Sequence, residues 1–248
     1  KGAALATVIS QAVSCIWILK FLTGKKTFLK IKRKYMLLKK NIILPAVALG
    51  LSPFIMQFTE SVLAVSFNTS LLKYGGDLAV GSMTILNSVN QFCMMPLNGL
   101  SQGAQPIVSY NYGAKRPKKV IKAWITMSVL ALIYSLIAWG IILLAPKFLI
   151  GIFSSDKSLM IDTIPAMKLY FAAFIFMIFQ YTGQTMFKSL DKKKQAIFFS
   201  LLRKVIIVVP LTYLLPYACH MGCNGVFIAE PVSNILGGSL CFIVMLAT

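Results

Sequence analysis

Long apolar runs, separated by short polar or basic segments, dominate this sequence. A helix that crosses a bilayer needs about 20 consecutive apolar residues, and seven segments reach that length. The runs lack the alternation of β-barrel strands, and an unpaired backbone group in lipid is costly, so the pattern predicts α-helices. The predicted spans are Gly2–Leu22, Ile42–Leu72, Leu78–Tyr112, Val120–Pro146, Thr163–Phe187, Ala196–Tyr217 and Gly225–Ala247.

Composition agrees with a membrane protein. Hydrophobic residues make up 58% of the 248 positions and charged residues only 12%, with a mean hydropathy of +0.79. A soluble domain carries about a quarter charged residues. The predicted fold class is therefore all-α: a polytopic transmembrane bundle of about seven spans.

The net charge of +19 raises the question of nucleic-acid binding. Its basic residues are not striped along amphipathic helices, so we expect no nucleic-acid partner. They fall into three blocks, at Lys20–Lys40, Lys115–Lys122 and Lys188–Lys204, the last including Arg203 and Lys204. With seven alternating spans all three blocks share one side, which the positive-inside rule predicts to be cytoplasmic.

The first and last predicted spans resemble each other. Gly2, Ala6 and Ser10 match Gly225, Ala229 and Ser233 in spacing. Small residues at this spacing also suit a tight helix contact, so an internal repeat of six spans and simple packing both remain open. A repeat predicts this domain organisation: 1–22 as the last span of a preceding lobe, 23–40 as a basic cytoplasmic loop, and 41–248 as a six-helix lobe.

Glu60 lies in the middle of the second predicted span. A carboxylate at the bilayer centre costs about 2.5–3.5 kcal/mol, and such a group usually faces a cavity, where it binds a cation or a proton. The alternative is an acid paired with a neighbouring helix. Gln57 sits one turn earlier on the same face. Glu230 lies near the outer end of the last predicted span, where functional and structural roles are equally open.

Amide side chains form stripes in two other spans. Asn87, Asn90 and Gln91 share one helical face, and Gln180 and Gln184 lie one turn apart. A polar stripe in lipid needs a partner helix or a water-filled cavity, which leaves interhelical bonding and substrate contact open. The 12 methionines and 17 phenylalanines would suit promiscuous apolar ligands.

Motifs for catalysis are missing from the sequence. It contains no phosphate-binding loop, dinucleotide fingerprint, zinc motif or catalytic triad pattern, so we expect no enzyme activity, no cofactor and no metal site. Cys219, His220 and Cys223 form a short cluster near a predicted external loop. Two cysteines and one histidine are a weak metal signal, and an irregular loop or a disulfide are the alternatives.

The stretch PLNGLSQGAQPIVSYNYGAK, residues 96–115, resembles a signature of the multidrug and toxic compound extrusion family. Gly2–Thr7 is similar to the start of that family's sixth helix, so the resemblance covers the whole chain as helices six to twelve, closest to the bacterial multidrug branch. The signature residues, which the resemblance places near an inner gate, are Gln102, Gly103, Gln105, Pro106, Tyr110, Asn111, Tyr112 and Gly113.

The resemblance implies a plasma-membrane antiporter with two six-helix lobes around a cavity. It implies export of bulky, often cationic organic compounds, coupled to Na⁺ or H⁺, with an N-terminal lobe of the same protein as partner. Glu60 falls near the position of an ion-binding acid, whereas Met177 stands about where a partner aspartate is expected. The residues that would line or brace the cavity are Gln57, Asn87, Asn90, Gln91, Gln180 and Gln184.

Two other functions remain open. A lipid-linked oligosaccharide flippase of the same superfamily would need cationic cavity residues for its phosphate, and we expect no central arginine in these spans. A membrane scaffold that transports nothing is the third hypothesis, supported by the absence of a first lobe.

Overall fold

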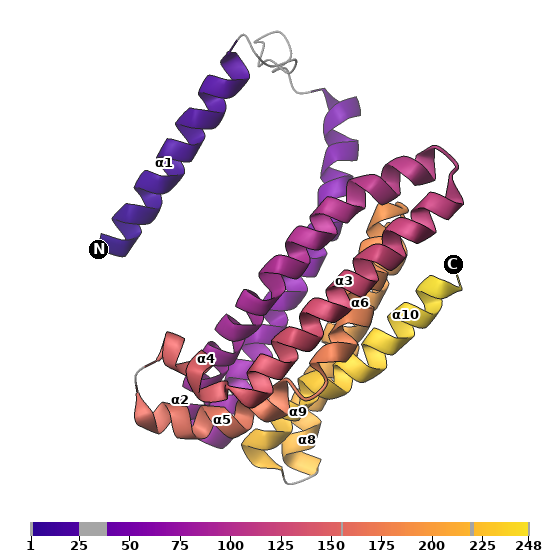
Figure 1. Cartoon of the computed structure of the whole chain (residues 1–248). Coiled ribbons are helices and arrows are strands. Elements are labelled where there is room, and N and C mark those ends of the chain that lie inside the picture. Colours follow the sequence, from indigo (N-terminus) through magenta and orange to yellow (C-terminus); the bar gives the residue numbers. More distant parts are fainter. Residues whose placement is uncertain (1, 25–38, 155, 219–220, 248) are drawn as a thin grey trace. The chain divides into compact units, whose positions relative to one another are not determined.

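The computed structural model describes residues 2–24, 39–154, 156–218 and 221–247 (Figure 1). These residues form helices without a strand, which confirms the predicted all-α class. Residues 25–38, most of the predicted basic loop, and Cys219 and His220 lie outside them. The elements are α1 (Gly2–Thr23), α2 (Lys40–Gly113), α3 (Pro117–Leu144), α4 (Pro146–Phe153), α5 (Lys157–Tyr170), α6 (Phe174–Ser189), α7 (Lys193–Leu201), the π-helical η2 (Leu202–Val208), α8 (Val209–Ala218), α9 (Gly222–Ser233), the π-helical η3 (Asn234–Gly238) and α10 (Ser239–Leu246).

The chain divides into two compact units, Lys1–Gly50 and Leu51–Thr248. The first unit holds α1 and the beginning of α2. The second unit holds the rest of α2 and all later elements.

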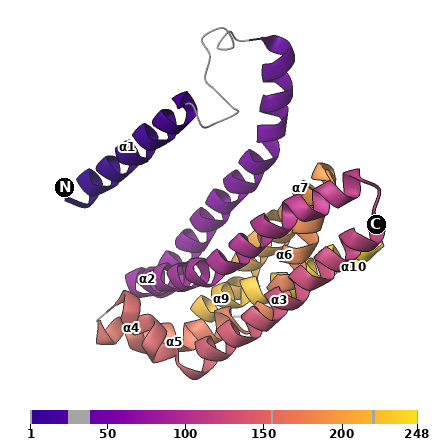
Figure 2. The same ribbon diagram turned by 45° about the horizontal axis from the view of Figure 1, so that its top comes forward.

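Helix α2 combines the second and third predicted spans. Its backbone breaks at Gly76, where φ is 65° and ψ is −161°. Glycine adopts this region without the steric penalty that a β-carbon brings. Figure 2 shows the two arms of α2 that meet at the break. A single residue therefore replaces the loop expected between the two spans.

Within the described residues, four helices are long and apolar enough to cross a membrane, and a fifth span results if the bent pair α5 and α6 counts as one. Helix α2 is not among these helices. The two arms of α2 carry the carboxylate and most of the amide residues that the sequence predicted for the cavity. The predicted span Thr163–Phe187 is the bent pair, with 55° between its helices.

The bend between α5 and α6 is held by a neighbouring helix. The Trp139 indole Nε1 donates a hydrogen bond to the Phe171 carbonyl oxygen over 2.8 Å. Such a bond satisfies a backbone acceptor at the point where the regular helix ends, which matters in a membrane.

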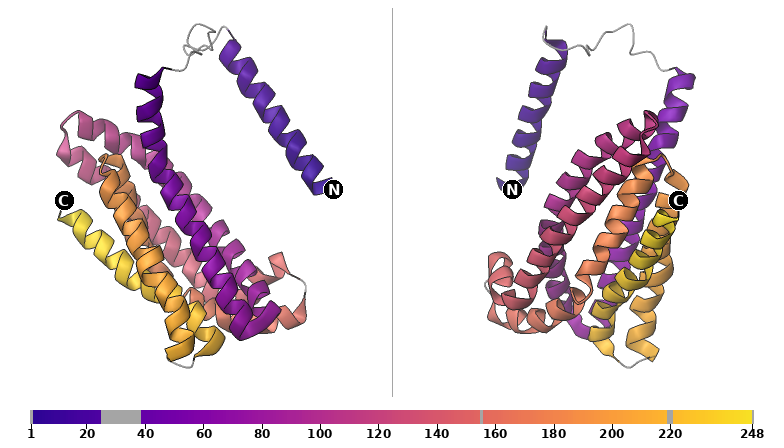
Figure 3. Two further views of the ribbon diagram at one scale, coloured as in Figure 1. Left: turned by 180° about the vertical axis from the view of Figure 1, so that it is seen from behind. Right: turned by 45° about the vertical axis from the view of Figure 1, so that its right-hand side comes forward.

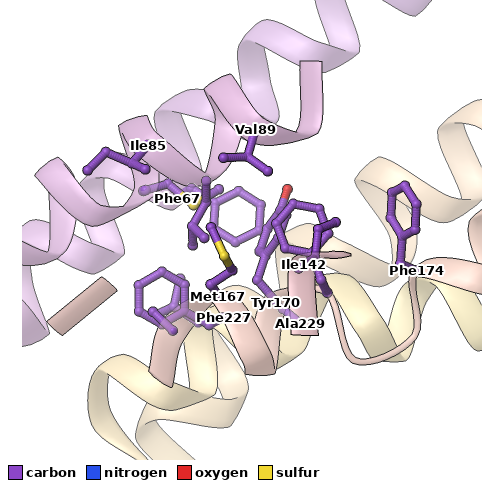
Figure 4. Packing of buried hydrophobic residues seen from close by; sticks show 14 of the residues in the cluster. Phe67, Ile85, Val89, Ile142, Met167, Tyr170, Phe174, Phe227 and Ala229 are labelled. Atoms are coloured by element: carbon purple, nitrogen blue, oxygen red, sulfur yellow. The ribbon is translucent and has the colours of Figure 1, made fainter. Parts of the chain in front are cut away.

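The core of the second unit lies where both arms of α2 meet α3, α5, α6 and α9 (Figure 4). Side chains from α2, α3, α5 and α9 lie together there, and Phe174 of α6 stands to one side in this view. Helix α6 also packs against α3 and α10, and α8 packs against α9 (Figure 3). The residues labelled in the close view are Phe67, Ile85, Val89, Ile142, Met167, Tyr170, Phe174, Phe227 and Ala229.

Polar contacts fix α6 against the second arm of α2. The Tyr181 hydroxyl donates to Asn98 Oδ1 over 2.8 Å, and the hydroxyls of Ser101 and Thr185 lie 2.9 Å apart. Farther along, the Ser109 hydroxyl donates to the backbone oxygen of Ser189 over 3.0 Å. Because residue numbers rise together on both sides, the two helices run parallel.

Candidate functional site

The second unit contains a polar cavity of about 560 Å³. Both arms of α2, helix α6 and the π-helical segment η2 contribute its walls. All seven residues that the sequence predicted for ion coupling and the cavity lie around it. Its lining consists of Met56, Gln57, Glu60, Asn87, Asn90, Gln91, Met94, Asn98, Met177, Gln180, Tyr181, Gln184, Arg203 and Lys204.

The arms of α2 present their polar residues on one face. Residues three or four positions apart lie on the same side of a helix, which places Gln57 beside Glu60 and groups Asn87, Asn90 and Gln91. The opposite faces are apolar or shielded, since Thr59 and Val89 are buried. Helical periodicity therefore places the polar residues of each arm at the cavity and other residues of the same arm in the packed interior.

Helix α6 supplies Gln180 and Gln184 from the side of the core. Gln180 is buried, and its amide Nε2 donates to the Phe199 backbone oxygen over 3.4 Å. Its Oε1 is buried with no hydrogen-bond partner. Met177, which stands about where the resemblance leads us to expect an aspartate, lines the cavity as well.

Arg203 and Lys204 correct the sequence-based assignment. We counted them with the basic block at the fifth connection and expected no arginine at the centre of a span. The structure places both inside Lys194–Ala218, one of the apolar membrane-length helices, with both side chains at the cavity. The apolar sequence on both sides of the pair, Ala196–Leu202 and Val205–Pro210, was the available signal.

Arg203 pairs with Glu230 in the interior. The guanidinium Nη1 donates to Glu230 Oε1 over 2.9 Å and also to Asn234 Oδ1. Both side chains are less than a tenth exposed. Glu230, which the sequence placed near an outer helix end, therefore lies buried among polar partners, although its Oε2 has no hydrogen-bond partner.

Lys204 pairs with Glu60 at the edge of the cavity. The Lys204 ammonium contacts Glu60 Oε1. The Glu60 side chain is 48% exposed, whereas that of Lys204 is 12% exposed. Behind this pair, a second cavity of about 140 Å³ is lined by Glu60, Arg203 and Glu230 together with Asn68 and other residues. Four charged groups thus lie together, two carboxylates and two cations.

The π-helical segments place these charges. η2 carries Arg203 and Lys204, η3 begins with Asn234, and the two segments pack against each other. Gly237 in η3 makes the contact possible, because a β-carbon there would lie 2.8 Å from Cγ of Arg203. π-Helical turns often mark functional sites.

The signature residues lie beyond the cavity, at the end of α2, where the helix stops at Gly113. Asn111 Nδ2 donates to the Ile107 backbone oxygen over 2.8 Å. Among the described residues no group of three or more His, Cys, Asp or Glu side chains is arranged to hold a metal ion. Cys219 and His220 fall outside those residues, so their role stays a prediction.

Comparisons with known proteins agree with this architecture. The chain is 28% identical over 160 residues to the multidrug export protein MepA of Staphylococcus saprophyticus, covering 64% of this chain and 35% of that protein. MepA of Staphylococcus aureus N315 is 24% identical over 244 residues, 97% of this chain and 51% of the relative. The chain thus spans about a third to a half of these relatives.

A solved structure described as the outward-facing conformation of a multidrug resistance MATE family transporter of the MOP superfamily shares the fold. Its TM-score is 0.87 at 19% identity, covering 99% of this chain and 55% of that one. The MatE family profile matches residues 53–214, well over half of the sequence. The chain belongs to the MatE family.

Proposed function

We propose that the chain forms the C-terminal lobe of a cation-coupled exporter of bulky organic cations. The observation that carries the proposal is the composition of the cavity. Amides, three methionines and Tyr181 surround one carboxylate, Glu60, whose side chain is half exposed, and Arg203 and Lys204 complete the lining. Methionine adapts to ligands of varied shape, and an accessible carboxylate within a membrane protein favours a positive charge. The MepA relatives carry the name multidrug export protein.

Glu60 is the residue that couples transport to an ion in this proposal. It holds Na⁺ or H⁺ in one conformation and releases it in the other. An ion that binds two conformations with unequal affinity shifts the equilibrium between them, and this coupling lets an ion gradient drive the drug outward.

The test is Glu60→Gln in the protein expressed from its complete reading frame. The substitution keeps the shape of the side chain and removes its ionisable group. Drug efflux, normalised to protein amount and driven in turn by sodium and proton gradients, should be lost while membrane insertion is retained. The matched control is Asp162→Asn, an exposed carboxylate away from the cavity, which should transport normally. If Glu60→Gln shows unchanged normalised efflux under both gradients, the coupling role of Glu60 is wrong.

A flippase for phosphate-linked lipids gains one argument from the structure, because Arg203 and Lys204 do line the cavity. Both cations, however, are paired with carboxylates. The cluster of Glu60, Glu230, Arg203 and Lys204 is formally neutral and offers no net positive charge to a phosphate, so we favour export of cations.

A membrane scaffold that transports nothing is the remaining alternative. Loss of drug efflux in the parent protein as well as in every variant would support it.

We further propose that the basic segments face the cytoplasm of a plasma-membrane protein. In a background without native cysteines, a cysteine at exposed Lys118 should resist an impermeant maleimide in intact cells, while one at exposed Lys147 should react. The positive-inside rule gives this orientation. The opposite labelling pattern would overturn it.

A further inference from the structure

The Glu60 carboxylate already holds a cation that belongs to the protein. Lys204 reaches it from η2, a different helix from the one that carries Glu60. The contact lies at the cavity wall, where both residues are among the lining. An entering organic cation would therefore find its counter-ion occupied.

The surroundings of the two partners are unequal. Lys204 is mostly enclosed, whereas about half of the Glu60 side chain faces open space. A ligand can approach the carboxylate from the open side without first displacing protein. The lysine side chain is flexible and has a compact charged group, so it can leave the carboxylate by rotation about its own bonds.

We propose that Lys204 is a tethered competitor for Glu60, and that the transported substrate is a monovalent organic cation that displaces the Lys204 ammonium from this carboxylate. This inference rests on the proposed export function and deepens it. Exchange of the ammonium for the organic cation keeps one positive charge on Glu60 in the conformation that binds substrate. The displaced ammonium moves into the polar cavity, where the amides of Asn87, Asn90 and Gln91 offer acceptors.

The inference also predicts how sodium acts on the site. With Lys204 in place, the two carboxylates, Glu60 and Glu230, are balanced by Arg203 and Lys204. In this conformation a small inorganic cation adds a charge to a neutral cluster and gains little. Without Lys204 the cluster carries one uncompensated negative charge, and sodium then competes with the organic cation for Glu60.

The experiment measures binding of tetraphenylphosphonium to the purified protein from the complete reading frame, in low and in high NaCl. Lys204→Met should tighten binding in low NaCl about tenfold, within the usual range of coupling between sites. It should also make binding weaken more steeply as NaCl rises than it does in the parent. The parent protein and Lys204→Arg, which keeps the cation, should show the same small dependence on NaCl. Lys147→Met, an exposed lysine outside the cavity, is the matched control.

Unchanged or weaker tetraphenylphosphonium binding by Lys204→Met overturns the inference. Should that variant fail to fold, Lys204→Gln removes the same charge and serves in its place, with the same two outcomes. Glu60→Gln separates this inference from the proposed function. If Glu60→Gln binds the probe as well as the parent does, Glu60 is no cation site and the export proposal fails. If Glu60→Gln loses binding while removal of the Lys204 charge does not tighten it, only the competitor role of Lys204 fails.

Discussion

Arg203 and Lys204 are neighbours in sequence, yet the carboxylates that they bind lie in different surroundings. Glu230 is enclosed on all sides, and Arg203 is also bonded to Asn234 and packed against Gly237. Glu60 is half exposed at a cavity, and Lys204 reaches it with a single ammonium group. The two pairs combine the same charges and both cations are largely enclosed, but only the Glu60 carboxylate is open to solvent.

This difference separates a structural ion pair from an exchangeable one. Removing one partner of a buried pair leaves an uncompensated charge in a medium of low dielectric, which is strongly destabilising. A pair that borders open space can trade its partner for another cation or for water at small cost. We therefore assign Arg203 and Glu230 to stability and Lys204 and Glu60 to transport.

The largest effect should follow Arg203→Met, which leaves the Glu230 carboxylate buried without its cation. We expect a loss of about 3–5 kcal/mol in the free energy of unfolding. Unfolding by sodium dodecyl sulfate in mixed micelles measures it. The double variant Arg203→Met with Glu230→Met removes both charges and should recover most of the loss. If Arg203→Met alone were as stable as the parent, the pair of Arg203 and Glu230 would not be structural and would not differ from that of Lys204 and Glu60.

Gly237→Ala tests the packing that holds the Arg203 side chain. A β-carbon at this position comes within 2.8 Å of Arg203 Cγ and 3.0 Å of its Cβ. Overpacking of this kind costs about 1–3 kcal/mol. Gly140→Ala in α3 is the control, because a β-carbon there meets nothing within 4 Å. Equal stability of the two alanine variants, measured by the same unfolding assay, would argue against a fixed Arg203.

Glu60→Gln should change stability much less than Arg203→Met, by about 1 kcal/mol or less, because its side chain is half exposed. Its main effect is on transport. The same assay applies, and a loss as large as that of Arg203→Met would show that the cavity pair is structural too.

The smallest effect is expected at Asp156, a carboxylate in water at the start of α5. Its side chain accepts hydrogen bonds from the hydroxyl and the backbone N–H of Ser158, and these bonds lower the pKa of Asp156. Its stabilising effect is then complete above the ordinary carboxyl pKa of about 4 and is lost as the pH falls through the lowered value. The free energies of unfolding of Asp156→Asn and of the parent should differ more at pH 7 than at pH 2. A difference in this free energy that grows on acidification would contradict the assignment.

Helical periodicity was enough to predict which polar residues share one face of a helix. Gln57, Glu60, Asn87, Asn90 and Gln91 follow from spacing within one helix, since polar side chains in lipid must share a sheltered face. The fold class follows from the length of the apolar runs. That residues of separate helices meet at one cavity does not follow from spacing within a helix, and the family resemblance supplied that grouping.

The two cations of the cavity were missed for a physical reason. Positive charges near a helix end are normally counted with the loop, because long side chains reach water from there. Arg203 and Lys204 lie farther inside, where their charge is tolerated only because carboxylates on α2 and α9 lie opposite. Such a long-range pairing is a property of the packed helices and not of any local pattern. The π-helical turns depend on packing in the same way.

The π-helical turn η2 also sets the phase of the helix that contains it. A π turn bonds each residue to one five positions away, so it takes up one residue more than an α-turn of the same course. Each residue of an α-helix rotates the chain by about 100°. Arg203 and Lys204 face the cavity, while Thr212 and Pro216 farther along are buried, the latter against Gly225. Deleting one residue from η2 would therefore leave an α-turn of the same course, so the contact of α8 with α9 could keep its register while Arg203 and Lys204 would no longer share their place at the cavity.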